Sequence, residues 1–353
     1  MENPDSGNAH RRRWLPWLFG TAAVVALVVG VVESSQVVAF ARIVEHARPW
    51  WVALGCVLQL GTYVVQGEVW RVVGRRSGTR LSIVAATELS LVKLFIDQAL
   101  PSGGLSGAVT IAQALQNRGM TEAAAIATVV IDTVTYYLAF LIALAAAMLL
   151  AAGAGHASLL IAAAAIAVAA FAIAAVVTIL RLADGRPPTV RVLQRAGFVR
   201  RTFDIVRKAD RALVHDRHTR RAATMLQLGI IVLDAATVVV LVHAMGSGVS
   251  LAGVFASYMI SSVFRTLGIL PGGLGSFEAA SVLTLRAIGV PTAAALSATL
   301  IYRGLSFWLP MVPGFVASRH ILGRASRMHR LRGSGCTRPV PARKRGHASC
   351  FPP

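Results

Sequence analysis

The sequence has 353 residues, of which 56% are apolar and only 14% are charged, and its mean hydropathy is +0.65. This composition excludes an ordinary soluble domain and predicts an all-α polytopic membrane protein. The net charge of +20 could indicate nucleic-acid binding. Most basic residues, however, lie in the tails and in one loop beside apolar runs, which is typical of cytoplasmic faces, so we expect no nucleic-acid partner.

The N-terminal region predicts a polar cytoplasmic tail over residues 1–13 and a first membrane span over about 14–32. A cleaved signal peptide is the alternative, because Ala39-Phe40-Ala41 resembles a cleavage site, but the apolar run is long and the site lies well beyond it. A second span is expected from about Trp50 to Val73. The arginines that follow it place the loop near Gly78, and hence the N-terminus, in the cytoplasm.

Residues 82–117 contain a helix break with the sequence LPSGGLSG at 100–107, since Pro and Gly both disfavour helix. Two apolar spans follow, at about 122–151 and 157–180. The loop 181–221 carries twelve basic and four acidic residues and is therefore expected in the cytoplasm. Counting back from that loop puts both ends of 82–117 on the cytoplasmic side, which predicts a re-entrant hairpin.

A second break has the sequence LPGGLGSFE at residues 270–278. Residues 222–245 are expected to cross outward, 250–288 to form a second hairpin, and 291–320 to return to the cytoplasm. Ser276 is expected to cap the new half-helix, with Glu278 in its first turn. The tail 323–353 is basic, which agrees with a cytoplasmic C-terminus, and its Pro, Gly and Arg content predicts disorder.

The two broken segments form an internal repeat at an offset of 170 residues. Leu100, Pro101 and Gly103 match Leu270, Pro271 and Gly273. Three spans separate the hairpins, an odd number, so the repeats (around 82–151 and 250–320, within a transmembrane domain of 14–322) are predicted to be inverted. Inverted repeats whose broken helices meet at the midplane are typical of a translocation site.

Apolar residues recur at helical spacing among the arginines of the basic loop, from Val192 to Leu213. This pattern predicts an amphipathic helix. Two interpretations stay open: the helix lies on an anionic membrane face, or it is a solvated connection.

Ionisable groups at membrane depth cost about 2.5–3.5 kcal/mol each at a helix centre, so each calls for an explanation. Lys93 and Asp97 in the first hairpin are spaced as a helical pair that can neutralise itself. Asp132 lies a third of the way into its span, and Asp234 lies centrally in another.

The second repeat carries two arginines, Arg265 shortly before Pro271 and Arg303 in the pair Tyr302-Arg303. In one interpretation they form a phosphate site with backbone donors of the half-helices. The small or breaking residues of that site are Pro101, Gly103, Gly104, Pro271, Gly272 and Gly273. In the other interpretation the arginines pair internally with Glu278, Asp132 or Asp234. The sequence contains no catalytic, metal-binding or cofactor-binding pattern.

The second break, with Tyr302-Arg303 and Phe307-Trp308-Leu309-Pro310, resembles the flippase-like transmembrane domain of lysylphosphatidylglycerol synthases, over about residues 15–320. Asp132 matches a common acidic position of that family, but Thr133 replaces an arginine that often follows it. The resemblance implies movement of aminoacylated phosphatidylglycerol between leaflets. In the two-part synthases a soluble transfer domain follows, whereas this sequence ends in a short basic tail, so we expect no enzymatic activity.

The expected function is therefore translocation of an anionic phospholipid or a lipid-linked phosphate, with anionic membrane lipids as partners and no cofactor. One alternative is a non-catalytic accessory membrane module for a separate lipid-modifying enzyme or glycosyltransferase. The candidate partners also include a second copy of the chain, as a homo-oligomer. A third, weaker option is an enzyme acting on a polyprenyl-phosphate. No ATP-binding element is apparent, so transport would be downhill or ion-coupled, with Asp132 or Asp234 as proton carrier. The expected location is a bacterial plasma membrane.

Overall fold

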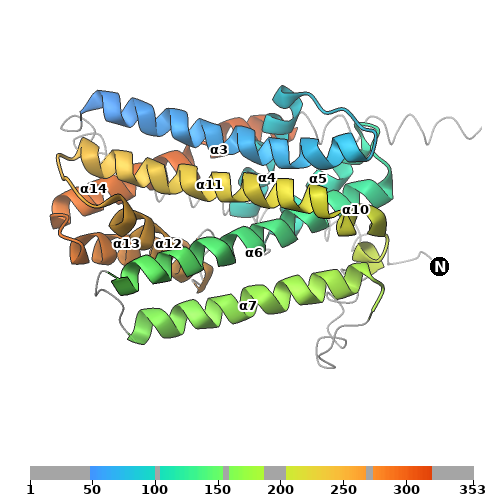
Figure 1. The fold of residues 1–353 in the computed structure, drawn as a ribbon. Helices are drawn as coiled ribbons and strands as arrows, with labels where there is room; N and C mark the ends of the chain where they lie inside the picture. The colour runs from blue at the N-terminus through green and yellow to red at the C-terminus, as the bar shows by residue number, and fades with distance from the viewer. Residues whose placement is uncertain (1–47, 100–103, 154–158, 187–203, 268–272, 320–353) are drawn as a thin grey trace, which may run out of the picture.

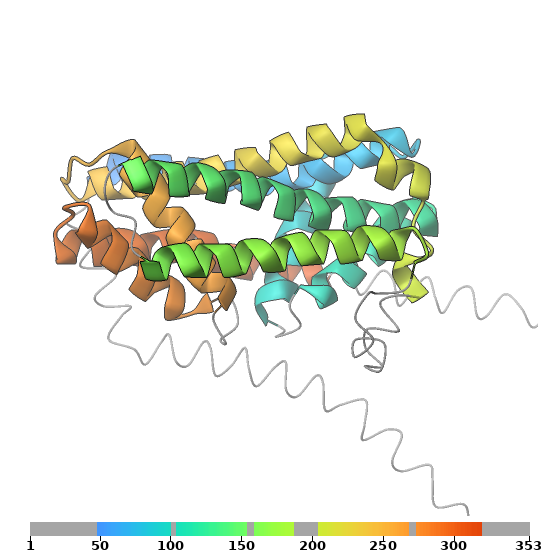
Figure 2. The same cartoon turned by 60° about the horizontal axis from the view of Figure 1, so that its bottom comes forward.

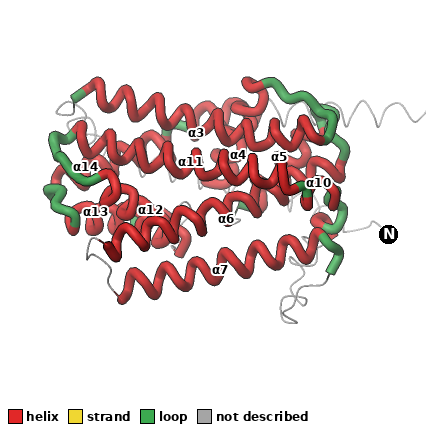
Figure 3. Tube along the Cα trace, in the orientation of Figure 1, coloured by secondary structure: helices red, strands yellow, loops and turns green. Residues whose placement is uncertain are grey.

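The computed structural model describes residues 48–99, 104–153, 159–186, 204–267 and 273–319, and within these ranges all regular structure is helical (Figure 3). The expected span 14–32 and the tail 323–353 lie outside them, as does most of the predicted amphipathic helix. The helices are α3 (Pro49–Arg76), α4 (Ile83–Ala99), α5 (Leu105–Gln116), α6 (Glu122–Gly153), α7 (Leu159–Ala183), α10 (Arg211–His215), α11 (Arg217–Ala244), α12 (Leu251–Leu267), α13 (Ser276–Ala287) and α14 (Thr292–Arg303).

Four long helices, α3, α11, α6 and α7, run side by side in that order (Figures 1 and 2). Five helical segments in the described part of the chain are long and apolar enough to cross a membrane. They are Pro49–Arg76, Glu122–Gly153, Ile161–Ala183, Arg217–Ala244 and Thr292–Arg319. These five match the spans predicted from the second onward, and the chain is a multi-pass membrane protein.

The two predicted breaks each separate two helices of matching length. α4 and α12 have 17 residues each, and α5 and α13 have 12 each. A 12-residue helix is only about 18 Å long, whereas a bilayer core is about 30 Å thick. In Figures 1 and 2, α5 lies toward the end of the bundle that carries α10, and α13 lies toward the opposite end.

The prediction that Ser276 caps α13 is wrong by one position. The helix begins at Ser276, and Gly275 takes the cap position with a φ of 83°. Glycine is favoured there because a left-handed conformation is costly for residues with a Cβ. The Ser276 hydroxyl instead donates to the Gly273 carbonyl at 3.1 Å, and the Glu278 carboxylate accepts from the Gly275 N–H at 2.7 Å. Glu278 does lie in the first turn, as predicted.

α4 is packed between α3 and the helical turns 311–319 at very close range. A Cβ on Gly67 of α3 would lie 2.8 Å from the carbonyl carbon of Ala86, and one on Gly314 would lie 2.5 Å from the carbonyl oxygen of Leu91. Real Cβ atoms do not approach so closely, so glycine is required at both contacts. The backbone of α4, in the first broken segment, is therefore in close contact with the bundle on two sides.

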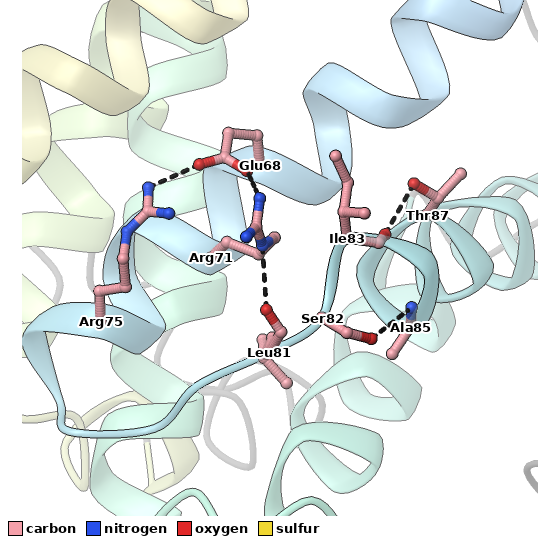
Figure 4. A network of polar contacts seen from close by, with 8 residues as sticks. All are labelled: Glu68, Arg71, Arg75, Leu81, Ser82, Ile83, Ala85 and Thr87. Atoms are coloured by element: carbon pink, nitrogen blue, oxygen red, sulfur yellow. Dashed lines mark hydrogen bonds and ion pairs between the residues drawn. The ribbon is translucent and has the colours of Figure 1, made fainter.

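A polar network fixes the entry into α4 (Figure 4). Glu68 of α3 binds Arg71 and Arg75, and Arg71 donates to the Leu81 carbonyl at 3.0 Å. The Ser82 hydroxyl accepts from the Ala85 N–H at 3.2 Å and so caps α4. These contacts turn the chain back immediately after α3.

Asp216 joins the start of α11 to the end of α3. Its carboxylate caps α11 by accepting from the N–H groups of His218 and Thr219, and it pairs with Arg76 of α3 at 3.0 Å. The hydroxyl of Thr219 donates to the same carboxylate and is the main reason that the pKa of Asp216 is lowered to about 2. The cap is therefore ionised at physiological pH.

A π-helical turn, Gly304–Trp308, follows α14, in which Leu309 donates to the Gly304 carbonyl at 2.8 Å. In this pattern the Leu305 carbonyl would accept from residue 310, which is Pro310 and has no N–H. The Tyr63 hydroxyl of α3 donates to the Leu305 carbonyl instead, at 2.8 Å. The irregular turn is thus satisfied by a side chain from another helix.

We expect Tyr63→Phe to lower the free energy of unfolding by about 1–3 kcal/mol, because it leaves a buried carbonyl without a donor. Adding Pro310→Ala in that background supplies an N–H at residue 310 and should restore part of the loss. Thermal unfolding in detergent micelles would measure both. Equal stability of wild type and Tyr63→Phe would mean that the Leu305 carbonyl finds another donor.

Candidate functional site

A cavity of about 770 Å³ opens inside the bundle, and the described residues that line it come from both broken segments. Gly104 at the start of α5 and Gly273 before α13 both face it. Side chains of α3, α6, α11 and α14 complete its walls. The two breaks, 170 residues apart in the sequence, therefore share one cavity.

At the first break, Lys93 and Asp97 form the predicted pair on α4, with 3.1 Å between Nζ and Oδ2. Gly107 of α5 packs directly against the Asp97 carboxyl group, and a Cβ at that position would overlap it. The small residue thus lets a charged pair fit between the two half-helices, at the wall of the cavity.

Asp132 and Asp234 are held by amide side chains rather than by the arginines. Asp132 of α6 accepts from Gln66 of α3 at 2.8 Å and from Gln227 of α11 at 3.0 Å. Asp234 of α11 accepts from Gln59 of α3 at 3.2 Å and from the Tyr258 hydroxyl of α12 at 3.0 Å. Neither aspartate forms an ion pair within the described part of the chain.

At the second break, Gly273 (φ 65°) lies against the methylene stem of Arg265. A side chain at residue 273 would collide with Arg265, so the glycine lets the backbone approach the arginine closely. The Arg265 guanidinium lines the cavity and lies 5.9 Å from the centre of the Phe277 ring. None of its contacts with other described residues is an ion pair.

Arg303 has a different environment from Arg265. Its Nε donates to the Glu278 carboxylate at 2.7 Å, and its guanidinium lies over the rings of Phe277 (5.5 Å) and Phe307 (4.8 Å). Tyr302 stacks on Phe277 with 5.6 Å between ring centres. The predicted internal pairing is therefore confirmed for Arg303 with Glu278, and Asp132 and Asp234 are not its partners.

The structure brings most of the predicted site residues together. Lining the cavity are Gly104, Asp132, Arg265, Gly273, Tyr302 and Arg303. Glu278 adjoins it through its pair with Arg303. The remaining predicted residues, Pro101, Gly103, Pro271 and Gly272, lie outside the described residues.

Sequence reasoning missed the glutamines that hold the aspartates. Gln59 and Gln66 are seven residues apart on α3, and Gln227 and Asp234 are seven apart on α11. A spacing of seven residues returns to the same helix face after two turns. Matching polar stripes in two apolar spans were thus a usable sign that α3 and α11 pack face to face.

Gly107→Ala is expected to lower the free energy of unfolding by about 1–3 kcal/mol, because the added methyl group displaces Asp97 and breaks its pair with Lys93. Gly229→Ala is the matched control, since it is also helical but has no atom within 4 Å of the new Cβ. The control should fold at least as stably as wild type, as alanine favours helix by about 0.5–1 kcal/mol. Thermal unfolding in detergent micelles measures the difference; equal stability of wild type and Gly107→Ala would show that the close packing of Gly107 on Asp97 is unimportant.

Two comparisons with known proteins gave a match. The family described as lysylphosphatidylglycerol synthase TM region matches residues 17–314. A phosphatidylglycerol lysyltransferase of Staphylococcus haemolyticus (strain JCSC1435) is 25% identical over 108 residues, which are 31% of this chain. Those residues cover only 11% of the relative, so the similarity concerns a small part of that protein.

Proposed function

Because the chain belongs to the lysylphosphatidylglycerol synthase TM region family, as its second break and Tyr302-Arg303 predicted, we propose that it moves a lipid between the two leaflets. The lipid is an anionic phospholipid or a lipid-linked phosphate. In this proposal the chain makes and breaks no covalent bond; it binds a head group in the cavity and releases it on the other side.

The observation that supports this function best is the cavity shared by the two helix breaks. A lipid phosphate needs donors that approach it closely, and at Gly104 and Gly273 the backbone itself lines the cavity, with no side chain in between. Arg265 adds a guanidinium that is not committed to an ion pair with another described residue, and such a group binds phosphate in a bidentate way.

The proposed topology is six spans with both termini cytoplasmic, and two re-entrant hairpins that enter from opposite sides. Equal helix lengths at the two breaks, and the placement of α5 and α13 toward opposite ends of the bundle, support this inverted repeat (Figure 1). The cytoplasmic side is assigned from charge. The end of the bundle that carries Arg76, Arg118 and the mainly basic residues 204–221 is taken as cytoplasmic. Two related halves around one site give an outward-open and an inward-open state.

Cysteine labelling tests the topology. Single cysteines at Gly78 and at Arg118, in a background without native cysteines, should both be shielded from an impermeant reagent added outside. Labelling of one site alone would show that residues 82–117 cross the membrane and would remove the inverted repeat.

Lipid exchange tests the function. The purified chain is reconstituted into liposomes with fluorescent phosphatidylglycerol or a fluorescent polyprenyl-phosphate, and loss of signal after a membrane-impermeant quencher is added reports leaflet exchange. We expect exchange of at least one lipid to be faster than in empty liposomes. No exchange of either class would contradict the proposal and favour an accessory module for a separate enzyme.

A further inference from the structure

Asp234 is a carboxylate in the cavity whose direct partners are all neutral. Gln59 donates to its Oδ1 at 3.2 Å, and the Tyr258 hydroxyl donates to its Oδ2 at 3.0 Å. Asp132 shares this property, since Gln66 and Gln227 donate to it. Asp97 and Glu278 differ, because they pair with Lys93 and Arg303. Placing a carboxylate at membrane depth without a cationic partner costs free energy. Its presence there therefore calls for a functional reason.

The charges around the cavity also do not balance. Three cations and four carboxylates line or adjoin it: Lys93, Arg265, Arg303, Asp97, Asp132, Asp234 and Glu278. With all of them ionised, the described part of the site has one negative charge in excess. A lipid phosphate would add another negative charge, which a low-dielectric site opposes.

Arg265 links this imbalance to Asp234. Both side chains line the cavity, and Tyr258, which donates to Asp234, lies two turns before Arg265 on the same face of α12, although Asp234 and Arg265 are not in ion-pair contact. A phosphate that binds Arg265 neutralises the positive charge of this side chain. Asp234 is then left with neutral donors only, and gaining a proton cancels the negative charge that the phosphate adds.

We propose that Asp234 is a proton-binding site that is loaded together with the lipid phosphate, so that one proton crosses with each lipid anion. The proton comes from water on the loading side, forms an O–H bond on Asp234, and returns to water on the opposite side when the phosphate leaves Arg265. This inference rests on the proposed function and adds its coupling ion.

Other ionisable groups contact Asp234 or line the same cavity from the helices packed against α11. Five are tyrosines: Tyr258 from α12, whose hydroxyl donates to Asp234, and, in the cavity lining, Tyr63 from α3, Tyr136 and Tyr137 from α6 and Tyr302 from α14. The charged groups are Asp132 from α6, Arg265 from α12 and Arg303 from α14. Asp132 is the one competing proton carrier among them.

The test is the steady-state distribution of fluorescent phosphatidylglycerol in liposomes that hold the full-length chain under an imposed pH difference, with the membrane potential clamped at zero. Coupling of one proton to each lipid anion predicts lipid accumulation in the leaflet facing the alkaline side. The ratio should approach about tenfold for one pH unit, which is a tenfold difference in proton activity. Empty liposomes at the same pH difference correct for movement without protein.

Whatever exchange Asp234→Asn retains should leave the lipid evenly distributed, and Glu122→Gln, which changes an exposed carboxylate paired with Lys208, should respond like wild type. Wild-type exchange with an even distribution under the pH difference would overturn the coupling and leave the proposed function intact. So would a response that Asp132→Asn abolishes and Asp234→Asn keeps, or one that follows a sodium gradient instead. Absence of any wild-type exchange would overturn the coupling and the proposed function together.

Discussion

Glu278→Ala is expected to lower the free energy of unfolding by about 3–5 kcal/mol, because it breaks a buried ion pair by removing the carboxylate partner of Arg303. The two side chains are only 6% (Arg303) and 19% (Glu278) exposed, so water cannot replace the lost partner effectively. The same carboxylate accepts from the Gly275 N–H, so the start of α13 loses its cap as well. Unfolding in detergent micelles by denaturant titration would measure the loss.

A double variant separates the charge effect from packing. Glu278→Ala with Arg303→Met removes both charges and places a thioether beside the rings of Phe277 and Phe307, where sulfur packs well. We expect it to be more stable than Glu278→Ala alone. A loss below about 1 kcal/mol in Glu278→Ala would contradict a buried ion pair and match an exposed one.

The positions of the breaks could be predicted from sequence because their causes are local. Proline and glycine disrupt a helix wherever they occur, and a long apolar run predicts a span by itself. For the same reason the pairing of Lys93 with Asp97 was predictable, since both residues lie on one helix four positions apart. The cap of α13 was assigned to Ser276 instead of Gly275, because the backbone conformation at the cap depends on how the chain enters the helix.

The contacts that could not be predicted join helices far apart in the sequence. Tyr63 completes a π-helical turn that lies 242 residues later, and no local signal connects the two. The different environments of Arg265 and Arg303 are a second case. Arg265 precedes the second break and Arg303 follows it. Arg303 is held by Glu278 and two aromatic rings, whereas Arg265 faces the cavity. Only the folded arrangement tells them apart.

This difference makes Arg265 the better candidate for direct contact with a lipid phosphate. Arg265→Gln is expected to slow lipid exchange by about 10- to 100-fold, since a hydrogen bond to a charged group contributes about 1.5–3 kcal/mol. Glutamine keeps the methylene stem against which Gly273 packs, so the second break should stay folded.

The matched control for Arg265→Gln is Arg286→Gln, which removes an exposed arginine from α13 of the same hairpin and should exchange lipid like wild type. Arg265→Lys should recover only part of the rate, because an ammonium group cannot bind a phosphate through two parallel hydrogen bonds. The readout is the leaflet-exchange rate in liposomes, with size-exclusion profiles of each variant as the measure of folding. A folded Arg265→Gln protein with the wild-type exchange rate would show that the phosphate is bound elsewhere in the cavity, with Lys93 as the next cation to replace.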